Sequence, residues 1–552
     1  MKSKYVIGVD YGTLSARAIV VDVGTGRTLA TAVEEYPHGV MVDALPDGTP
    51  LPKDWALQHP ADYLKVLETI VPQAVAASGV NKDDIIAIGT DFTASTTMPV
   101  DDDGWPLCLR PEYSQEPHAY VKLWKHHAAQ DQADRMTQIA KERREPWLAA
   151  YGGKVYSEWS LPRLWQVYEE APHIYKAMDA WVEAGDWLIW QLTGEYTQNS
   201  CTAGYKSFYQ KQTGYPTEEY FAALDEGLRH VIRDKCTAPI LTVGSKAGEL
   251  TEEWAQKLGL SAGIAVSTGM VDGHVAIFSC GITEPGPMMA IIGTSACYMT
   301  LGKTYTDVPG TCGTVEDGLM PGFYGYEAGQ SCVGDMLGWL VEHMMPARYE
   351  AEAKEMGLSR HQYLTMLAGK LKPGESGLLA LDWWNGNRSL LADSNLSGMI
   401  LGMTLQTKPE EIYRSLMEAA AFGARMIVEH YRKHGIPITE FRASGGISRK
   451  NPLMMQIYAD ILQMPVKVMD TDQGGALGAA IMGATAAGAG LGGYDDLRSA
   501  IAAMAAGVEV TYEPCEAHQA VYDRLYAEYC RLHDYFGRGG NDVMKRIRGG
   551  RL

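Results

Sequence analysis

The spacing of apolar residues near the start of the chain predicts a β-hairpin followed by a third strand. Apolar runs lie at 6–9 and 18–21, on either side of a Gly12-Thr13 turn, and a second turn at 22–26 leads into an extended segment at 29–34. Short apolar runs bounded by glycine-containing turns are typical of neighbouring strands in a sheet. We therefore expect three adjacent antiparallel strands.

A helix and a buried strand are predicted next. Apolar residues recur at helical spacing over 62–77, and the apolar run at 85–89 is typical of a strand that is buried on both faces. That strand delivers Asp91-Phe-Thr-Ala-Ser95 at its carboxyl end, where ligands bind in α/β sheets. Residues 118–192 are rich in tryptophan, and we expect them to be a mostly helical elaboration of the first half.

The strand-turn-strand pattern recurs past the middle of the chain, where Gly293-Thr294-Ser295 interrupts apolar residues at 288–301. Helices and strands then alternate, which implies βαβ units and parallel strands. The predicted elements are a helix at 410–434, a strand at 440–443, a helix at 452–462, a strand at 466–469, a helix at 476–487 and a last helix at 516–536. The pattern predicts an α/β protein.

The two Gly-Thr turns have the chemistry of a phosphate site. Glycine lets backbone N–H groups approach an anion closely, and hydroxyl groups add neutral donors. The hydroxyl-bearing residues of the two turns are Thr13, Ser15, Thr294 and Ser295. Two such turns about half a chain apart suggest two halves of one fold that close on one triphosphate.

Composition narrows the classes of partner. A chain of 552 residues is long enough for two to four domains, and 46% of it is apolar, as in ordinary globular proteins. The formal charge of -19 repels polyanions, so nucleic-acid binding is not expected. An anionic nucleotide would have to be held by backbone donors and by a divalent metal that screens its charge.

Cysteine usage and the termini bear on location. The nine cysteines are scattered and form no CxxC pair, which is typical of reduced, buried thiols and favours the cytoplasm. The first residues lack the apolar run of a signal peptide. The uncharged stretch at 474–494 is made of Ala and Gly, so it predicts a closely packed helix rather than a membrane span. We expect the basic tail at 545–551 to be a frayed, solvated end.

Two aspartates stand where chemistry is expected. Asp10 ends the first strand beside the Gly-Thr turn and could bind magnesium, or it could stabilise the turn through its own backbone. Asp272 follows a strand at 264–267, where it could cap a helix or act as a base. The histidines show no metal-binding spacing, so a histidine-metal site is not expected. The motifs GxSxG, GxxxxGK[ST] and GxGxxG are absent, and Gly445-Gly446 is left as a close-approach site for a nucleotide.

These motifs together resemble those of the FGGY carbohydrate kinases, over 5 to about 491. The matching segments are Asp10-Tyr-Gly-Thr, Asp91-Phe-Thr-Ala-Ser, Gly269-Met-Val-Asp272, Gly293-Thr-Ser, Ala443-Ser-Gly-Gly-Ile-Ser-Arg-Lys-Asn-Pro452 and Gly398-Met-Ile-Leu-Gly-Met403. The segments at 89–96 and 324–331 are similar to those of the ribulokinase subfamily in particular. The N-terminal signature departs from the family at 154–165, where Pro162 stands in place of a common Lys and Arg163 is the nearest substitute.

The resemblance implies two actin-like domains of the ribonuclease-H-like type, with ATP and sugar in the cleft between them. It divides the chain into an N-terminal domain at 1–285, a C-terminal domain at 286–500 and a closing helix and tail at 501–552. It makes Asp272 the general base and places Asp10 and Asp272 beside Mg²⁺. The implied phosphate residues are Gly12, Thr13, Ser15, Gly293 and Thr294, the adenosine residues are Gly445, Gly446 and Asn451, and the sugar residues are Ala94, Trp124, Lys206, Asp272 and Glu327.

The chemistry of sugar recognition agrees with these implied sugar-binding residues, because a polyol needs fixed charged partners and an aromatic face. Two alternatives stay open at this point. Lys206 could be a solvated surface lysine, and Trp124, which we expect on a helix with Val121 and Lys125, could be a core residue. Glu327 is hard to explain as a surface residue, since its neighbours are small or aromatic.

The expected function is that of a cytoplasmic, Mg²⁺-dependent kinase that transfers phosphate from ATP to L-ribulose in L-arabinose catabolism. The nearest alternative is a kinase of the same family for xylulose, D-ribulose or glycerol. A different class would be a non-catalytic actin-like ATPase switch, but the chain ends in a helix and a short tail rather than a peptide-binding domain. No nucleic-acid or membrane partner is expected, and a homodimer is left open.

Overall fold

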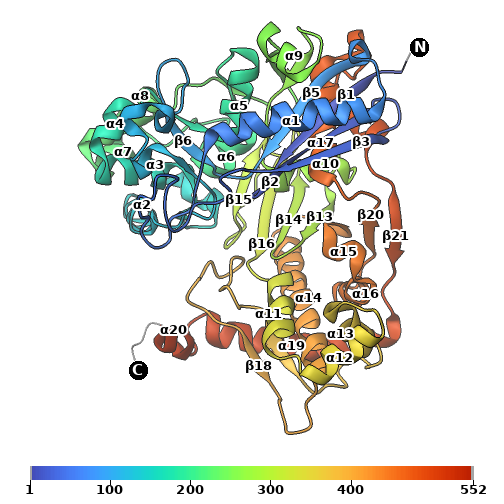
Figure 1. Cartoon of the computed structure of the whole chain (residues 1–552). Coiled ribbons are helices and arrows are strands. Elements are labelled where there is room, and N and C mark those ends of the chain that lie inside the picture. Colours follow the sequence, from blue (N-terminus) through green and yellow to red (C-terminus); the bar gives the residue numbers. More distant parts are fainter. Residues whose placement is uncertain (1–2, 549–552) are drawn as a thin grey trace.

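The computed structural model describes residues 3–548. A six-stranded sheet forms the core of the first half (Figure 1), and it begins with the predicted meander, because β1 pairs antiparallel with β2 and β2 with β3. Strands β5 and β12 follow on the other side of β1 and run parallel to it. In spatial order the strands are β11 (Lys246–Glu249), β12 (Ala265–Ser267), β5 (Ile85–Phe92), β1 (Tyr5–Tyr11), β2 (Ser15–Asp22) and β3 (Thr28–Glu35).

A seven-stranded sheet in the second half repeats this order. Strand β13 pairs antiparallel with β14 and β14 with β16, while β19 and β20 follow parallel to β13. In spatial order the strands are β15 (Gly313–Glu316), β16 (Tyr324–Gln330), β14 (Ala296–Gly302), β13 (Gly286–Ile292), β19 (Ile438–Ser444), β20 (Val466–Met469) and β21 (Val508–Tyr512). Each sheet therefore contains three antiparallel strands followed by two parallel ones, which is a duplicated ribonuclease-H-like core.

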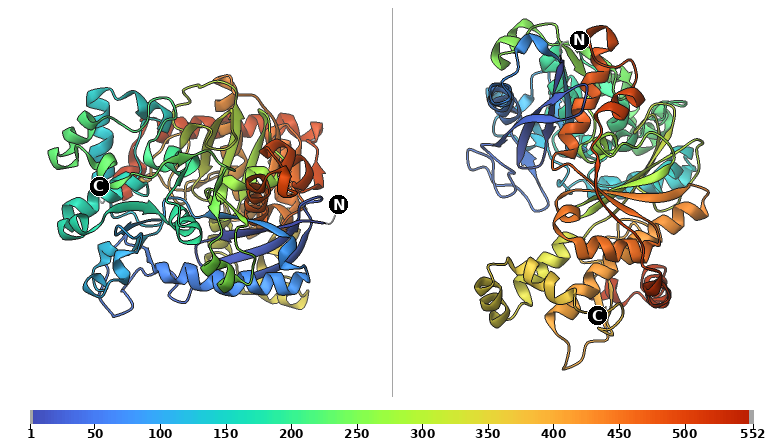
Figure 2. Two further views of the ribbon diagram at one scale, coloured as in Figure 1. Left: turned by 90° about the horizontal axis from the view of Figure 1, so that it is seen from above. Right: turned by 90° about the vertical axis from the view of Figure 1, so that its right-hand side faces the viewer.

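Helices α1 and α17 cover opposite faces of the first sheet (Figure 2, right). Helix α17 comes from the far end of the chain, and its small residues allow very close packing. A Cβ on Gly8 would lie 1.9 Å from the carbonyl oxygen of Ala476, and one on Gly89 would lie 1.8 Å from that of Ala479. The predicted packed Ala/Gly helix is thus confirmed, and it lies on the sheet of the first half.

Helix α10 crosses α17 at similarly close range, since a Cβ on Gly478 would lie 2.2 Å from the carbonyl oxygen of Val275. Helix α10 follows the last parallel strand of the first sheet, and α17 follows its counterpart in the second. The two equivalent helices thus pack against each other where the two halves meet.

The region at 118–192 forms much of a lobe beside the first sheet (Figure 1), and it is mostly helical, as predicted. Two of its segments are strands of a small four-stranded sheet, whose members in order are β4 (Leu57–Gln58), β7 (Val121–Lys122), β6 (Thr97–Val100) and β8 (Ala180–Glu183). Trp147, Trp159, Trp165 and Trp181 are buried in a core that belongs to the lobe itself, whereas Trp187 and Trp190 pack in the core of the first sheet. Two further strand pairs join β9 (Gln198–Asn199) to β10 (Ile240–Leu241) and β17 (Leu379–Leu381) to β18 (Met399–Leu401).

The helices complete the two halves. Those of the first half are α1 (Pro60–Ser78), α2 (Gln130–Arg143), α3 (Ser160–Glu170), α4 (Pro172–Ala177), α5 (Ala184–Thr193), α6 (Ser200–Ser207), α7 (Glu218–Leu224), α8 (Val231–Lys235), α9 (Glu252–Leu258) and α10 (Asp272–Ser279). Those of the second half are α11 (Gly334–His343), α12 (Ala347–Glu355), α13 (Arg360–Ala368), α14 (Pro409–Lys433), α15 (Gly446–Lys450), α16 (Pro452–Leu462), α17 (Gly474–Ala487), α18 (Leu497–Met504), α19 (Glu516–Gly537) and α20 (Val543–Arg548).

The prediction of a frayed basic tail is wrong for 545–548. These residues belong to α20, which is anchored to the loop after β17. Arg548 donates hydrogen bonds to the carbonyl oxygens of Ser394 and Leu396, at 2.8 Å each, and Lys545 Nζ lies 2.5 Å from Asp393 Oδ2. The rest of the expected tail, 549–551, lies outside the described residues.

All nine cysteines are free thiols, as predicted, but only five of them are fully buried. Cys236, Cys297, Cys515 and Cys530 are partly exposed. Among residues 3–548, no helix has both the length and the apolar character needed to cross a membrane.

Candidate active site

Three aspartates meet where the first sheet ends against α10. Asp10 on β1 and Asp91 on β5 are neighbours in the parallel register, so the fold places their carboxyl groups together. Asp272 is the first residue of α10, and Val271 just before it bridges to Phe92 at the end of β5. The carboxyl ends of parallel strands are the edge at which α/β sheets bind ligands. Sequence analysis quoted Asp91 in a motif but gave it no role.

Burial raises the pKa of all three carboxyl groups. For Asp91, which is fully buried, the neighbouring charges of Asp10 and Asp272 raise the pKa further. Arg17, whose Nε lies 3.6 Å from Asp10 Oδ2, partly offsets the effect of burial on Asp10. For Asp272, burial and then the charge of Asp10 raise the pKa to about 7. A carboxylate with a pKa near neutrality is suited to general base catalysis.

The same carboxyl groups fit a divalent cation. Neither carboxyl oxygen of Asp91 accepts a hydrogen bond from any donor in the described part of the chain, although both are buried. A hard cation such as Mg²⁺ prefers oxygen ligands and would offset the cost of placing these charges together. The start of α17 closes over the pair, since a Cβ on Gly475 would lie 3.0 Å from Asp10 Oδ2 and 3.5 Å from Asp91 Oδ2.

Asp272 is not the N-cap of its helix, which is the alternative role considered from sequence. The N-cap residue is Val271, whose side chain makes no capping bond. Asp272 Oδ1 instead accepts a hydrogen bond from the adjacent Gly273 N–H at 2.6 Å.

The two Gly-Thr turns are the tips of equivalent hairpins, β1–β2 and β13–β14. In each turn the glycine amide closes the hairpin itself, because Gly12 N–H donates to Ser15 O at 3.0 Å and Gly293 N–H donates to Ser295 O at 2.9 Å. These two amides are therefore already used, and any phosphate donors must come from the residues that follow, such as Thr13 and Thr294.

Trp124 is neither helical nor buried, so the expected helix and the core alternative are wrong. It lies in a turn after β7, is 38% exposed and donates a hydrogen bond from Nε1 to Thr13 Oγ1 at 3.0 Å. The indole thus borders the first Gly-Thr turn and stays partly exposed, with Lys125 Nζ 5.2 Å from the ring centroid. An exposed indole can serve as an aromatic platform for a ligand.

Gly445 and Gly446 lie between β19 and α15, close to the second hairpin. Gly445 has φ of 97°, and a Cβ there would lie 2.8 Å from the carbonyl oxygen of Ile292, so only glycine fits. Asn451 is the N-cap of α16, and its Oδ1 accepts a hydrogen bond from Met454 N–H at 3.0 Å. Part of its side chain is therefore committed to the helix.

Lys206 and Glu327, 121 residues apart, form a buried ion pair with Nζ 3.0 Å from Oε2. The surface alternative for Lys206 is excluded, because its side chain is 5% exposed and that of Glu327 is 2% exposed. His274 Nε2 lies 3.3 Å from the same carboxylate oxygen. The positive charge of Lys206, followed by that of Arg388, counters burial and holds the pKa of Glu327 well below its usual value. Neither His274 nor Arg388 was predicted from the sequence: His274 stands two residues after Asp272 without a signal of its own, and Arg388 belongs to no local motif.

The segment at 154–165, where the sequence departs from the family signature, contains a residue that holds loops of the expected sugar site in place. Arg163 is fully buried, and its guanidinium donates hydrogen bonds to the carbonyl oxygens of Ser95, Lys122, Leu123 and His126. These acceptors lie on the loops that carry Ala94 and Trp124. A single arginine thus fixes two loops of the expected sugar site.

A histidine cluster also forms, against the expectation from local spacing. The ligand atoms of His38, His59 and Asp62 lie within 4.8 Å of one another, and the two imidazole rings stack at 4.4 Å. His38 Nδ1 lies 2.8 Å from Asp62 Oδ1. The residues could hold a metal ion, but His38 lies about 20 positions before His59 and Asp62, so no short motif reveals the cluster.

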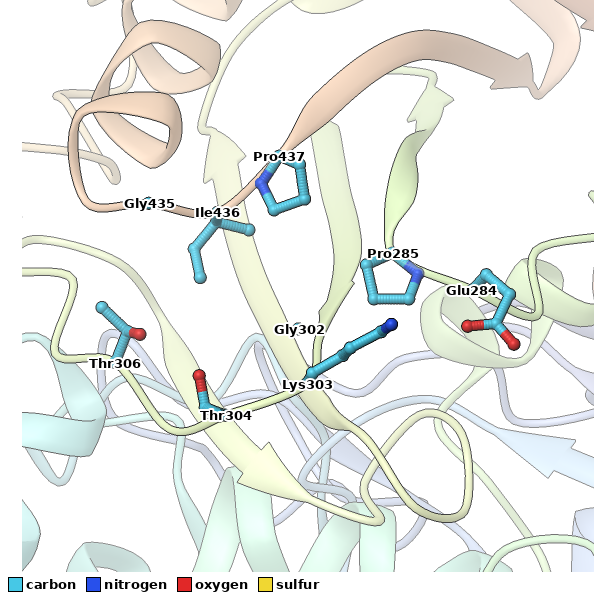
Figure 3. A pocket seen from close by; sticks show the side chains of 9 residues that line it. All are labelled: Glu284, Pro285, Gly302, Lys303, Thr304, Thr306, Gly435, Ile436 and Pro437. Atoms are coloured by element: carbon cyan, nitrogen blue, oxygen red, sulfur yellow. The ribbon is translucent and has the colours of Figure 1, made fainter.

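A cavity of about 360 Å³ lies away from these groups (Figure 3). It is bounded by Pro285 before β13, Gly302 at the end of β14 and Pro437 before β19, and Lys303 lines it. Strand β13 runs from this cavity toward the Gly293 turn at its other end. The cavity therefore lies at one end of the strands of the second sheet, and the Gly293 turn of the candidate active site lies at the other end.

The duplicated sheets place the chain in the class of two-domain proteins with an actin-like fold. Solved structures support that fold: a xylulose kinase from Rhodospirillum rubrum superposes with a TM-score of 0.78 at 24% identity, covering 96% of this chain and 98% of the other. A glycerol kinase from Plasmodium falciparum with ADP gives 0.75 at 15% identity, covering 96% and 98%.

The chain belongs to the FGGY family of carbohydrate kinases, which use ATP as phosphate donor. Residues 5–279 match the N-terminal domain of that family and residues 288–487 match the C-terminal domain. A ribulokinase from Bacillus licheniformis is 54% identical over 97% of this chain and 97% of its own length. A ribulokinase from Mycolicibacterium smegmatis is 46% identical over 99% of this chain and 96% of its own length.

Proposed function

We propose that this carbohydrate kinase phosphorylates L-ribulose to L-ribulose 5-phosphate, as a step in L-arabinose catabolism in the cytoplasm. The observation that carries the proposal is identity of 46% to 54% with proteins named ribulokinase, over nearly the full length of each. The buried pair Lys206–Glu327 supports it, because a desolvated lysine and carboxylate can select hydroxyl and carbonyl positions on a small sugar.

In the proposed reaction, Asp272 accepts the proton of the terminal hydroxyl as that oxygen attacks the γ-phosphorus of ATP and the bond to the β-phosphate oxygen breaks. Sugar phosphate and ADP are the products. The pKa of Asp272, raised to about 7, suits this step. Most of the acceleration is assigned to positioning and to electrostatic stabilisation of the transferred group.

The other roles follow the same geometry. Asp10 and Asp272 would hold Mg²⁺, which supplies charge neutralisation for the triphosphate when bound. We assign Thr13, Ser15 and Thr294 to the phosphates as donors, with Gly12 and Gly293 allowing the close approach of the phosphates to the turns. We assign Gly445, Gly446 and Asn451 to adenosine, and Ala94, Trp124, Lys206 and Glu327 to the sugar.

We also propose a domain boundary near 285, between α10 and β13, and a last segment from 501. The two family matches, which end at 279 and resume at 288, support the first boundary. Helix α17 belongs to the second domain by sequence but packs on the first sheet. A homodimer stays a prediction, which sedimentation analysis tests.

The test is ADP release with Mg-ATP and a panel of L-ribulose, D-ribulose, xylulose and glycerol, with the product phosphate located by NMR. We expect the highest kcat/KM for L-ribulose and phosphate on O5. A higher kcat/KM for another sugar would make that sugar the substrate and would leave the family assignment unchanged. Turnover that no sugar stimulates would contradict the proposal and favour an ATPase switch.

A further inference from the structure

The carboxylate of Glu327 has partners from both halves of the protein. Lys206 on α6 and His274 on α10 belong to the first half and approach Oε2. Arg388, in the loop after β17, belongs to the second half with Glu327 itself, and its Nη2 lies 2.5 Å from Oε1. Each oxygen of the carboxylate is thus held by groups from a different half of the chain.

Arg388 contacts the second sheet directly, and its loop also meets the first half where Lys154 Nζ donates a hydrogen bond to Ala392 O at 3.0 Å. The neighbouring Ser389 Oγ accepts a hydrogen bond from Gly329 N–H at 3.1 Å, which ties this loop to β16. Gly329 leaves room for the arginine, since a Cβ there would lie 2.9 Å from Arg388 Nη1. Nη1 also lies 3.5 Å from Cys297 Sγ on β14. Arg388 therefore stays with Glu327 in any movement of one half relative to the other.

This arrangement matters because sugar must enter between the two halves. In the present conformation Lys206 and Glu327 bond each other, so a sugar that contacts both must separate them or share them. A buried carboxylate that loses its only cation is costly, by several kcal/mol. With Arg388 in place, Glu327 keeps one charged partner while Lys206 turns to the substrate.

We infer that Arg388 is a positioning residue for the sugar site, which holds Glu327 ionised and oriented on the second domain so that Lys206 is free to bind substrate. The inference rests on the proposed function. Two cations face one carboxylate in this cluster, and only one of them is needed to neutralise it. The charge of Lys206 is then available to an electronegative group of the sugar. Cys297 adds no charge, because burial raises the pKa of its thiol.

The test compares Arg388→Met, which keeps length and removes charge, with Arg388→Lys, which keeps charge and loses the planar fork. A matched control is Arg531→Met, because Arg531 is 74% exposed on α19. Loss of a charge-assisted hydrogen bond is worth about 1.5 to 3 kcal/mol. We therefore expect Arg388→Met to raise the sugar KM by roughly ten- to a hundredfold. The KM for ATP should stay within about twofold and kcat should change less than the sugar KM. Arg388→Lys should restore part of the loss.

Two further measurements exclude a merely structural effect. Calorimetric titration of each variant with L-ribulose should show the same loss of affinity without turnover. Combining Arg388→Met with Glu327→Gln should weaken binding little beyond Glu327→Gln alone, because both changes remove one interaction. A folded Arg388→Met with wild-type sugar affinity, or equal losses for sugar and ATP, would overturn the inference. If Arg388→Met does not fold, wild-type sugar affinity in Arg388→Lys has the same force. Failure of the proposed function would appear separately, as a wild-type enzyme that does not act on L-ribulose.

Discussion

Replacing Asp272 by Asn tests the centre of the proposed mechanism. The amide keeps the size of the side chain and can still accept a hydrogen bond from Gly273 N–H, but it cannot take the hydroxyl proton in the transition state. Removal of a general base costs typically 10² to 10⁴ in rate. We expect kcat to fall by about that factor, while the dissociation constants for sugar and Mg-ATP change much less.

The pKa of Asp272 adds a prediction for the wild-type enzyme. Because it is raised to about 7, catalysis that needs the ionised form should fall as pH drops through that value. A group with that pKa is about 10% ionised at pH 6 and about 90% ionised at pH 8, so kcat/KM, which reports groups of the free enzyme, should rise roughly ninefold over this interval. Steady-state rates at substrate concentrations well below KM measure the profile.

The matched control is Asp131→Asn, since Asp131 also lies in the first turn of a helix but is exposed and far from the site in the fold. Its kcat should equal that of wild type.

The stability of the protein provides an independent test of the raised pKa of Asp272. A carboxyl whose folded pKa is raised binds protons more tightly when folded, so its contribution to stability falls as pH rises from about 4 to 7. Asp272→Asn should therefore unfold at no lower temperature than wild type at pH 8. A variant with kcat within a few fold of wild type, or a flat wild-type profile between pH 6 and 8, would refute the reasoning.

Three other outcomes are expected. Lys206→Met should raise the sugar KM by about ten- to a hundredfold through loss of a charged hydrogen bond and leave the KM for ATP near normal; unchanged KM values for all ketopentoses would remove Lys206 from the sugar site. Small-angle scattering should show that nucleotide and sugar together compact the protein more than either alone, because the two Gly-Thr turns lie in different halves; a ligand-independent radius would exclude closure. Burial raises the pKa of Asp186 to about 7, so the wild-type unfolding temperature should fall between pH 5 and 7, and Asp186→Asn should reduce that slope while Asp131→Asn leaves it unchanged.

Local patterns determined the elements of the two sheets. The hairpin at the start, the repeated hairpin after 288 and the βαβ alternation from 410 were predicted from apolar spacing and glycine turns, and the observed strands and helices match them closely. Short-range sterics and burial of one face decide such elements, so they are readable without the fold. In the lobe at 118–192 the helices were predicted but the strands were not, because its two-residue and four-residue strands pair with segments far away in sequence.

The sequence by itself determined the family, the two Gly-Thr turns, Asp10 beside the first turn and Asp272 after a strand, because each depends on residues that are adjacent in the chain. Only the tertiary structure decided what those residues contact. The parallel register of β1 and β5 makes Asp91 a neighbour of Asp10. Trp124 lies beside the first Gly-Thr turn rather than on the expected helix. The grouping around Glu327 brings in Lys206 from 121 residues before it and Arg388 from 61 residues after it, together with His274. Contacts of that range depend on the packing of whole domains rather than on any local pattern.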